Sequence, residues 1–252
     1  MLHGWRELSG LLLPVVCAGC GRPRTELCPV CETALHGGPA RPVRPSPRPP
    51  GLPPVFAAAP YENAVRAVLL AHKERGALGL AGALGRALAG GVRAGAGRSC
   101  GAGPLMLVPV PSARSATAAR GHDPVRRIAA AAARDLRRRG LPAQALPLLR
   151  HRRPVADQAG LRAWQRRANL AGALELTAGG RRLLRHGALR PGLFHHGRVI
   201  LVDDLLTTGS TLAEAARALG EAEGGARRPS VRAVCGAAVV AASPSAFEIN
   251  RN

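Results

Sequence analysis

Four short apolar runs along the chain predict buried strands. They are Val55–Tyr61, Pro104–Pro111, Val199–Val202 and Val231–Ala241. Continuous apolar runs bounded by turn residues are typical of strands covered on both faces. Between these runs, apolar positions recur at helical spacing, which predicts helices over Glu62–Lys73, Gly76–Gly90, Val125–Arg139 and the segment that follows Thr211. Strands that alternate with helices in this way indicate an α/β fold.

Three segments lack a clear core pattern. In Pro39–Pro54, eight of sixteen residues are proline, so we predict an extended, solvated spacer whose arginines are available to a phosphate backbone. This spacer divides the chain into residues 1–38, 39–54 and 55–252. Leu148–Ala173 is predicted as a surface helix anchored by a few apolar residues. Gly179–His196 is rich in Arg, Gly and His and is predicted as a solvated inserted loop, with a histidine metal tract as the weaker alternative.

The charge balance adds a possible class of partner. The chain has 252 residues, enough for one α/β domain and a small appendage, and a formal net charge of +21. Lys73 is the single lysine among 36 basic residues, so a coding bias toward arginine accounts for part of this charge. What remains favours a polyanionic partner such as single-stranded DNA or RNA. Aromatic residues make up only 2%, which argues against base stacking as the main mode of binding.

No stretch approaches the roughly 20 apolar residues of a membrane-spanning helix. The first residues, MLHGWRELSGLLLPVVC, have the outline of a signal peptide, but the apolar run is short and Glu7 occupies its basic region. We therefore expect a leader helix beside the cysteines and a cytoplasmic protein.

Two CxxC pairs predict a metal site. Cys17 and Cys20 are followed, after seven residues, by Cys28 and Cys31. This spacing brings four thiolates to one tetrahedral Zn²⁺, and four protein ligands make such a site structural rather than catalytic. The alternatives are two disulfides or inert thiols, and disulfides are rare in the cytoplasm.

The stretch Val199–Leu219 carries the most distinctive chemistry. An apolar strand is followed by Asp203 and Asp204, then by Thr207, Thr208, Gly209, Ser210 and Thr211, and then by a helix. A glycine-containing loop at a helix N-terminus favours phosphate binding, because unpaired N–H groups and the helix dipole face the ligand. The two carboxylates would repel a bare phosphate, so a sugar diol or a metal-bridged diphosphate suits them better. The alternative is an exposed acidic turn with Ser and Thr as helix caps.

Three basic residues are candidates for binding a diphosphate. Lys73 ends a predicted helix, and a compact ammonium is a suitable phosphate ligand, although one surviving lysine codon explains it equally well. Arg114 and Arg120 follow the strand that ends in Val-Pro-Val-Pro, at an edge where open α/β sheets bind ligands. Either is equally interpretable as a surface arginine.

Taken in order, these motifs resemble the ComF family of phosphoribosyltransferase-like proteins. The shared features are the four cysteines, a linker, the VPVP strand, an Arg-Gly turn at Arg120, a segment with Asp157-Gln158, and LVDDLLTTGST. The resemblance implies a type I phosphoribosyltransferase fold, in which helices flank a mostly parallel sheet, behind a small zinc domain. After Arg120-Gly121 the family pattern continues Phe-Asn-Gln, whereas this chain has His122, Asp123 and Pro124.

The resemblance also implies a ligand and a biological role. Asp203 and Asp204 would bind the ribose hydroxyls of phosphoribosyl pyrophosphate (PRPP), and residues 207–211 would bind its 5′-phosphate, with Mg²⁺ bridging the diphosphate. The implied setting is natural competence, with incoming single-stranded DNA or competence proteins as partners. Two other functions fit the same motifs: a non-catalytic accessory protein that handles single-stranded DNA, and a PRPP-sensing regulator.

Overall fold

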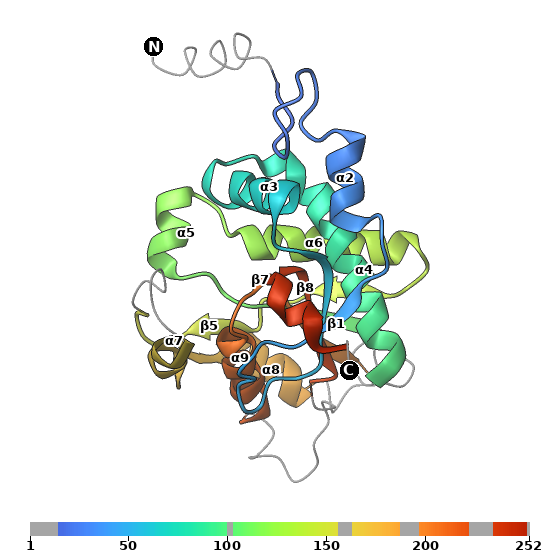
Figure 1. Ribbon diagram of the computed structural model, residues 1–252. Helices are drawn as coiled ribbons and strands as arrows, with labels where there is room; N and C mark the ends of the chain where they lie inside the picture. Colours follow the sequence, from blue (N-terminus) through green and yellow to red (C-terminus); the bar gives the residue numbers. More distant parts are fainter. Residues whose placement is uncertain (1–14, 100–102, 156–162, 187–196, 222–233, 251–252) are drawn as a thin grey trace, which may run out of the picture.

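The predicted apolar runs meet in a six-stranded central sheet. The computed structural model describes residues 15–99, 103–155, 163–186, 197–221 and 234–250. All neighbouring strands of this sheet are parallel except the first pair (Figure 1). The spatial order is β1 (Arg41–Val43), β2 (Val55–Pro60), β8 (Gly236–Ala242), β7 (Arg198–Leu206), β3 (Leu105–Pro109) and β4 (Ala143–Ala145). The prediction of an α/β fold with a mostly parallel sheet is confirmed.

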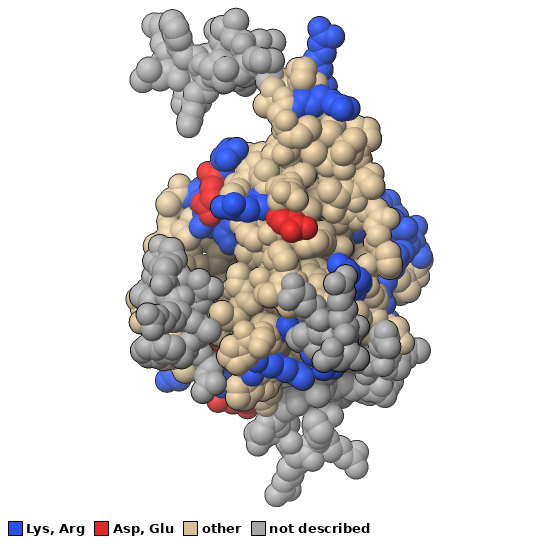
Figure 2. All heavy atoms as spheres, viewed as in Figure 1, with Lys and Arg blue, Asp and Glu red and all other residues tan. Residues whose placement is uncertain are grey.

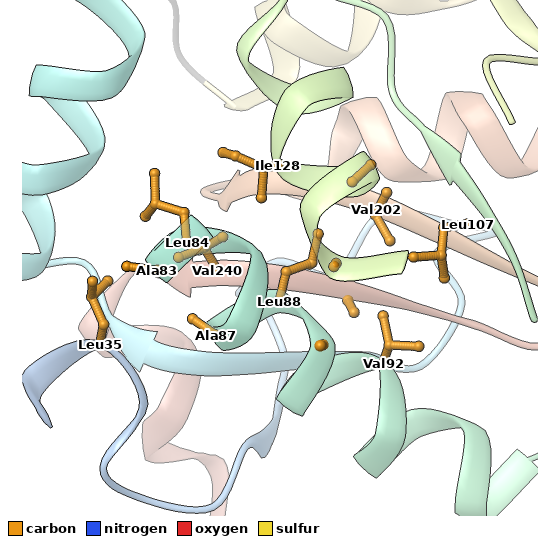
Figure 3. Close-up of a cluster of buried hydrophobic side chains, with 14 of the residues drawn as sticks. Leu35, Ala83, Leu84, Ala87, Leu88, Val92, Leu107, Ile128, Val202 and Val240 are labelled. Carbon is orange, nitrogen blue, oxygen red and sulfur yellow. The ribbon is translucent and has the colours of Figure 1, made fainter. Parts of the chain in front are cut away.

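Alternate residues of each central strand face two separate cores. One core lies under α3 (Asn63–Glu74), the short helix η1 (Leu78–Leu80), α4 (Ala81–Ser99) and α6 (Pro124–Arg138). Figure 3 shows part of it, where Leu84 and Leu88 of α4 meet Ile128, Val202 and Val240. The other core lies under α8 (Ala178–His186) and α9 (Ser210–Gly220). Helices on both faces explain why the strands read as uninterrupted apolar runs.

Smaller elements complete the fold around the two layers of helices. They are α2 (Pro29–His36), α5 (Arg114–Arg120), α7 (Ala163–Leu170), η2 (Pro244–Asn250), and a two-stranded antiparallel sheet of β5 (Leu149–His151) and β6 (Leu174–Leu176). Among the described residues, no helix is long and apolar enough to cross a membrane. Most of the predicted leader helix, residues 1–14, lies outside the described residues.

The order of the strands creates a switch point between β3 and β7. From β3 the chain passes through α5 and α6 to β4, on one side. From β7 it passes through α9 to β8, on the other side. In open parallel sheets, ligands bind at the carboxyl ends of the strands where the direction of winding reverses. This point therefore locates the candidate site at the ends of β3 and β7.

The proline-rich segment is part of the sheet, which differs from the prediction of a solvated spacer. Its residues 41–43 form β1, paired with β2, and Val43 and Leu52 are buried. Proline is tolerated here because β1 is an edge strand, where a missing N–H leaves no ladder bond unmade. Arg44 N–H donates to the Ala246 carbonyl at 2.9 Å, which holds the segment against the end of the chain. The three-part domain division stays a prediction.

Two predicted elements have other bounds or another form. The helix predicted over Gly76–Gly90 begins later, at Ala81, because Gly76 adopts a left-handed conformation (φ +68°) and η1 follows it. The predicted loop Gly179–His196 is helical up to His186, in α8, whose Leu184 is buried. Residues 187–196 lie outside the described residues. Leu148–Ala173 is not one helix, because it contains both β5 and α7.

Two glycines of α4 give a test of the core. A Cβ atom at Gly85 would lie 2.5 Å from the Ala131 Cβ and 2.8 Å from the Ala132 nitrogen on α6, whereas one at Gly90 would meet nothing within 4 Å. We expect Gly85→Ala to lower the free energy of unfolding by about 1–3 kcal/mol through overpacking. Gly90→Ala should raise it by about 0.5–1 kcal/mol, because alanine is the better helix former. Urea unfolding measures both, and equal effects of the two substitutions would contradict this packing.

Candidate functional site

The four predicted ligand cysteines come together near the N-terminal end of the described chain. Their sulfur atoms all lie within 4.8 Å of one another; Cys17, Cys28 and Cys31 are buried and Cys20 is exposed. The Cys20 and Cys28 sulfurs are 3.6 Å apart, and two thiolates on one tetrahedral Zn²⁺ are about 3.8 Å apart when each Zn–S bond is about 2.3 Å. The cluster can therefore bind a metal ion such as zinc.

Backbone N–H groups prepare this cluster for a cation. Burial raises the pKa of the Cys17 thiol, but N–H groups, including that of Cys28 at 3.3 Å, outweigh it and lower the pKa to about 6. The Cys31 N–H lowers the pKa of Cys28 against its burial, while burial and the neighbouring sulfurs raise that of Cys31. Thiolates gathered in a buried site require a compensating positive charge, and a coordinated metal ion supplies it.

Residues 15–36, here called the cysteine unit, pack directly against the helices that cover the central sheet. Leu35, one helical turn after Cys31, lies in the core under α3, α4 and α6, called the main core below (Figure 3). Glu32 forms an ion pair with Arg86 of α4. Gly19 lies so close to both parts that a Cβ atom there would be 2.6 Å from the Cys31 sulfur and 3.2 Å from the Ala64 Cβ on α3. The first CxxC turn therefore needs glycine at this position.

This geometry predicts the effect of one methyl group on metal retention. We expect purified protein to carry about one zinc per chain, and Gly19→Ala to release it at about tenfold lower chelator concentration, because supporting contacts commonly change metal affinity by 10–100-fold. Gly38→Ala is the matched control, since a Cβ atom there would meet nothing within 4 Å. Elemental mass spectrometry and a colorimetric zinc assay measure both. Native protein without bound metal would contradict the assignment.

The acidic pair lies at the carboxyl end of β7, beside Lys73. Asp203 and Asp204 are still within the strand, and Lys73 lies in the last turn of α3. The Lys73 Nζ atom donates to Asp204 Oδ2 at 3.0 Å, across 131 residues of sequence, and the Asp204 side chain is only 8% exposed. The structure therefore brings together the single lysine and one of the two predicted acids.

The charges of this ion pair shift the pKa values of neighbouring groups. The charge of Asp204 is the largest influence on Lys73 and raises the pKa of its ammonium group. Burial first, and then the Asp204 charge, raise the pKa of Asp203 well above that of an ordinary Asp carboxyl. The Asp203 Oδ1 atom accepts the Asp204 N–H at 2.8 Å. Because Asp204 is paired with Lys73, the site repels an anionic ligand less than two free carboxylates would.

The hydroxyl–glycine loop follows directly and leads into α9. Gly209 has a left-handed conformation (φ +74°), and the helix begins at Ser210. The Thr208 and Ser210 hydroxyl oxygens are 3.1 Å apart, and the Ser210 N–H donates to Thr208 Oγ1 at 3.4 Å. Thr207 is exposed and Thr211 is half-buried. The first turn of α9 therefore presents backbone N–H groups and hydroxyl groups, the groups that hold a phosphate.

The proline-rich segment covers one side of this loop. A Cβ atom at Gly209 would lie 3.0 Å from Leu52 Cδ2 and 3.2 Å from Pro45 Cγ. Arg48 donates from its guanidinium to the Leu52 carbonyl at 2.6 Å, which closes the segment on itself. A larger residue at position 209 would therefore be strained by the positive φ and would also clash with Leu52 and Pro45 of the proline-rich segment.

The structure places the two candidate arginines on α5, next to the end of α3. Arg120 Nε is 2.9 Å from Glu74 Oε2, so Arg120 is paired with the residue that follows Lys73. Arg114 begins α5, and its side chain lies outside the described residues. Asp157, Gln158, His195 and His196 also lie outside them. Arg120 therefore belongs to the neighbourhood of Lys73, held there by an acid that the sequence did not suggest.

Two histidines near Lys73 were not predicted as site residues. The His72 and His122 rings meet edge to face, with centroids 5.9 Å apart, and His122 Nε2 lies 3.2 Å from the His72 carbonyl oxygen. His72 is buried, and this burial lowers its pKa. His122 therefore connects the segment after Arg120 to the end of α3.

A buried ion pair fixes α9 to the small sheet. Glu214 accepts two bonds from Arg217, each of 2.7 Å, and the Leu174 N–H at 3.0 Å, while Arg217 donates to the Leu174 carbonyl. Burial alone would raise the pKa of Glu214, but these hydrogen bonds lower it. In the sequence, Glu214 lies between the apolar positions Leu212 and Ala215. This position could have predicted that Glu214 is buried and needs a cationic partner.

Comparison of the chain with models of known protein families gives no match, and comparison with curated proteins gives none. Its function is therefore inferred from its residues and their geometry.

Proposed function

We propose that this chain is a ComF-like member of the type I phosphoribosyltransferase fold that binds PRPP with Mg²⁺ in the cytoplasm. The observation that carries the proposal is the Lys73–Asp204 ion pair of 3.0 Å at the carboxyl end of β7. It places a cation, two acids and a loop with a helix N-terminus at one switch point of a parallel sheet. PRPP carries a diol between a 5′-phosphate and a diphosphate, and this combination of groups complements it.

Each part of the ligand has a suitable partner. The carboxyl groups of Asp203 and Asp204 would accept hydrogen bonds from the two ribose hydroxyls. The backbone and hydroxyl groups of residues 207–211 would hold the 5′-phosphate. Lys73 and Arg120 lie together at the ends of α3 and α5, where they would attract the diphosphate.

Mg²⁺ fits this donor set, because it prefers carboxylate, phosphate and water oxygens. Asp203 and Asp204 are the residues that would hold it, and when bound it would neutralise charge on the departing diphosphate. In phosphoribosyl transfer the bond from ribose C1 to the diphosphate oxygen breaks, and positive charge develops on the sugar. The contribution of this chain would be to orient the diol and to bind the anionic leaving group. None of the described residues is assigned as a general base.

PRPP sensing without transfer is the second candidate. The segment after Arg120 is fixed by polar contacts rather than by an aromatic side chain: Asp123 caps α6 by accepting the Arg126 N–H at 3.1 Å, and His122 is bonded to the His72 carbonyl. In a family whose pattern has Phe-Asn-Gln here, such a change favours binding over turnover.

Single-stranded DNA handling is the third candidate, and the net charge of +21 favours it. On the face that Figure 2 shows, Lys and Arg form separate groups rather than one continuous track. On this face, a DNA contact would therefore rest on separate phosphate contacts. Competence proteins would be further partners.

Calorimetry with PRPP and Mg²⁺ tests the proposal on the full, zinc-loaded chain. We expect binding that Asp203→Asn or Asp204→Asn weakens by about 10–100-fold, since hydrogen bonds to charged groups contribute about 1.5–3 kcal/mol each. Glu221→Gln, at the far end of α9, is the matched control and should bind like the unchanged protein. Absence of PRPP binding to the unchanged protein would refute the proposal.

Two further assays on the same proteins separate the candidates. Diphosphate release that depends on an added base, and that Asp204→Asn abolishes, indicates a transferase. PRPP binding without release indicates sensing. An affinity for single-stranded DNA that decreases steeply with salt concentration and does not change when PRPP is added indicates the accessory role.

A further inference from the structure

A cavity of about 310 Å³ lies at the carboxyl end of β3, the strand next to β7. Its apolar walls are Leu149 and three prolines, among them Pro109 and Pro111. Its polar lining comes from residues of four different segments, including Ser112, Asp123 and Arg126. Cavities that bind small molecules start at about 300 Å³ and combine apolar walls with a few polar groups. This cavity matches the lower end of that range.

The cavity begins one strand away from the acidic pair. Pro109 of β3 pairs with Val202 of β7, and the Val110 N–H donates to the Val202 carbonyl at 2.9 Å. Asp203 follows Val202 directly. Because neighbouring strands lie about 4.8 Å apart, a molecule in the cavity would lie next to a sugar held by Asp203 and Asp204.

The polar lining includes a cation and an acceptor that are available to a ligand. Among the described residues, Arg126 has no ion-pair partner, whereas Arg150, which also lines the cavity, is paired with Glu175 at 2.7 Å. Asp123 Oδ1 accepts the Ser112 hydroxyl at 3.3 Å and the Arg126 N–H at 3.1 Å. No described residue donates to the second oxygen of Asp123, which leaves it as an acceptor. Arg126 thus favours a carboxylate or carbonyl group, and Asp123 favours an N–H group.

The cavity wall is braced from the neighbouring small sheet. His151 of β5 donates from Nε2 to the Pro111 carbonyl at 3.1 Å, because a carbonyl oxygen can only accept. This bond ties the small sheet to the loop after β3. Apolar walls held in this way suit the faces of a flat ring.

We propose that this cavity is the acceptor site, and that it takes a small planar nitrogen heterocycle with a carboxylate or carbonyl edge toward Arg126 and a ring N–H toward Asp123. The proposal rests on the proposed function. A ring nitrogen would form the new bond to ribose C1 as the bond from C1 to the diphosphate breaks. The electron pair of that bond leaves on the diphosphate, and the ring proton passes to water.

Binding of single compounds to the full, zinc-loaded chain tests the assignment. Orotate and nicotinate serve as carboxylate-bearing probes, and adenine serves as a ring without a carboxylate or carbonyl group. We expect one of the two carboxylates to bind, and adenine to bind at least tenfold more weakly. Arg126→Gln should weaken carboxylate binding about tenfold or more. Arg134→Gln is the matched control, because Arg134 is an exposed arginine two turns along α6 that does not line the cavity.

Calorimetry or ligand-observed NMR, first without PRPP, gives the decisive comparison. Loss of carboxylate binding in Arg126→Gln but not in Arg134→Gln supports the acceptor site. Binding of neither carboxylate, equal binding to both variants, or adenine binding as tight as the carboxylates would overturn it. Because these measurements omit PRPP, their failure is distinct from a failure of PRPP binding, which would refute the proposed function.

Discussion

The ion pair between Lys73 and Asp204 is the contact on which the candidate site depends. It joins the end of α3 to the end of β7, two elements 131 residues apart, and it neutralises a carboxylate that is almost fully buried. A buried carboxylate without a partner is costly, so the pair also fixes where α3 ends relative to the sheet. With Asp204 paired and the pKa of Asp203 raised, the proposed anionic ligand would meet less repulsion beside the two acids.

Other parts of the chain converge on the same edge of the sheet. The proline-rich segment packs on Gly209 through Pro45 and Leu52, and the cysteine unit reaches the main core through Leu35. Glu74, next to Lys73, holds Arg120. The described segments between residues 15 and 54 are therefore packed against the fold around the site. A metal ion in the cysteine cluster would stabilise this arrangement from the N-terminal side.

The sequence predicted the elements whose local chemistry is decisive and missed those that depend on distant contacts. Four apolar runs became β2, β3, β7 and β8, and the CxxC spacing correctly predicted a four-sulfur cluster. The segment Pro39–Pro54 was wrongly predicted as a solvated spacer, because proline composition does not reveal a free sheet edge that tolerates it. Glu74 and His122 were missed for the same reason: their partners, Arg120 and the His72 carbonyl, lie 46 and 50 residues away. For the same reason, the sequence alone could not identify the arginines that line the cavity beside β3.

A double-mutant cycle on Lys73 and Asp204 tests the central claim most directly. Urea unfolding of the unchanged protein, Lys73→Met, Asp204→Asn and the double variant gives the coupling free energy of the pair. If the pair organises the site, the coupling is about 0.5–3 kcal/mol, the range found for residues in direct contact. Lys73→Met alone is then more destabilising than the same change in the Asp204→Asn background. Additive effects, with coupling below about 0.3 kcal/mol, would show that the two residues do not interact and would contradict the account.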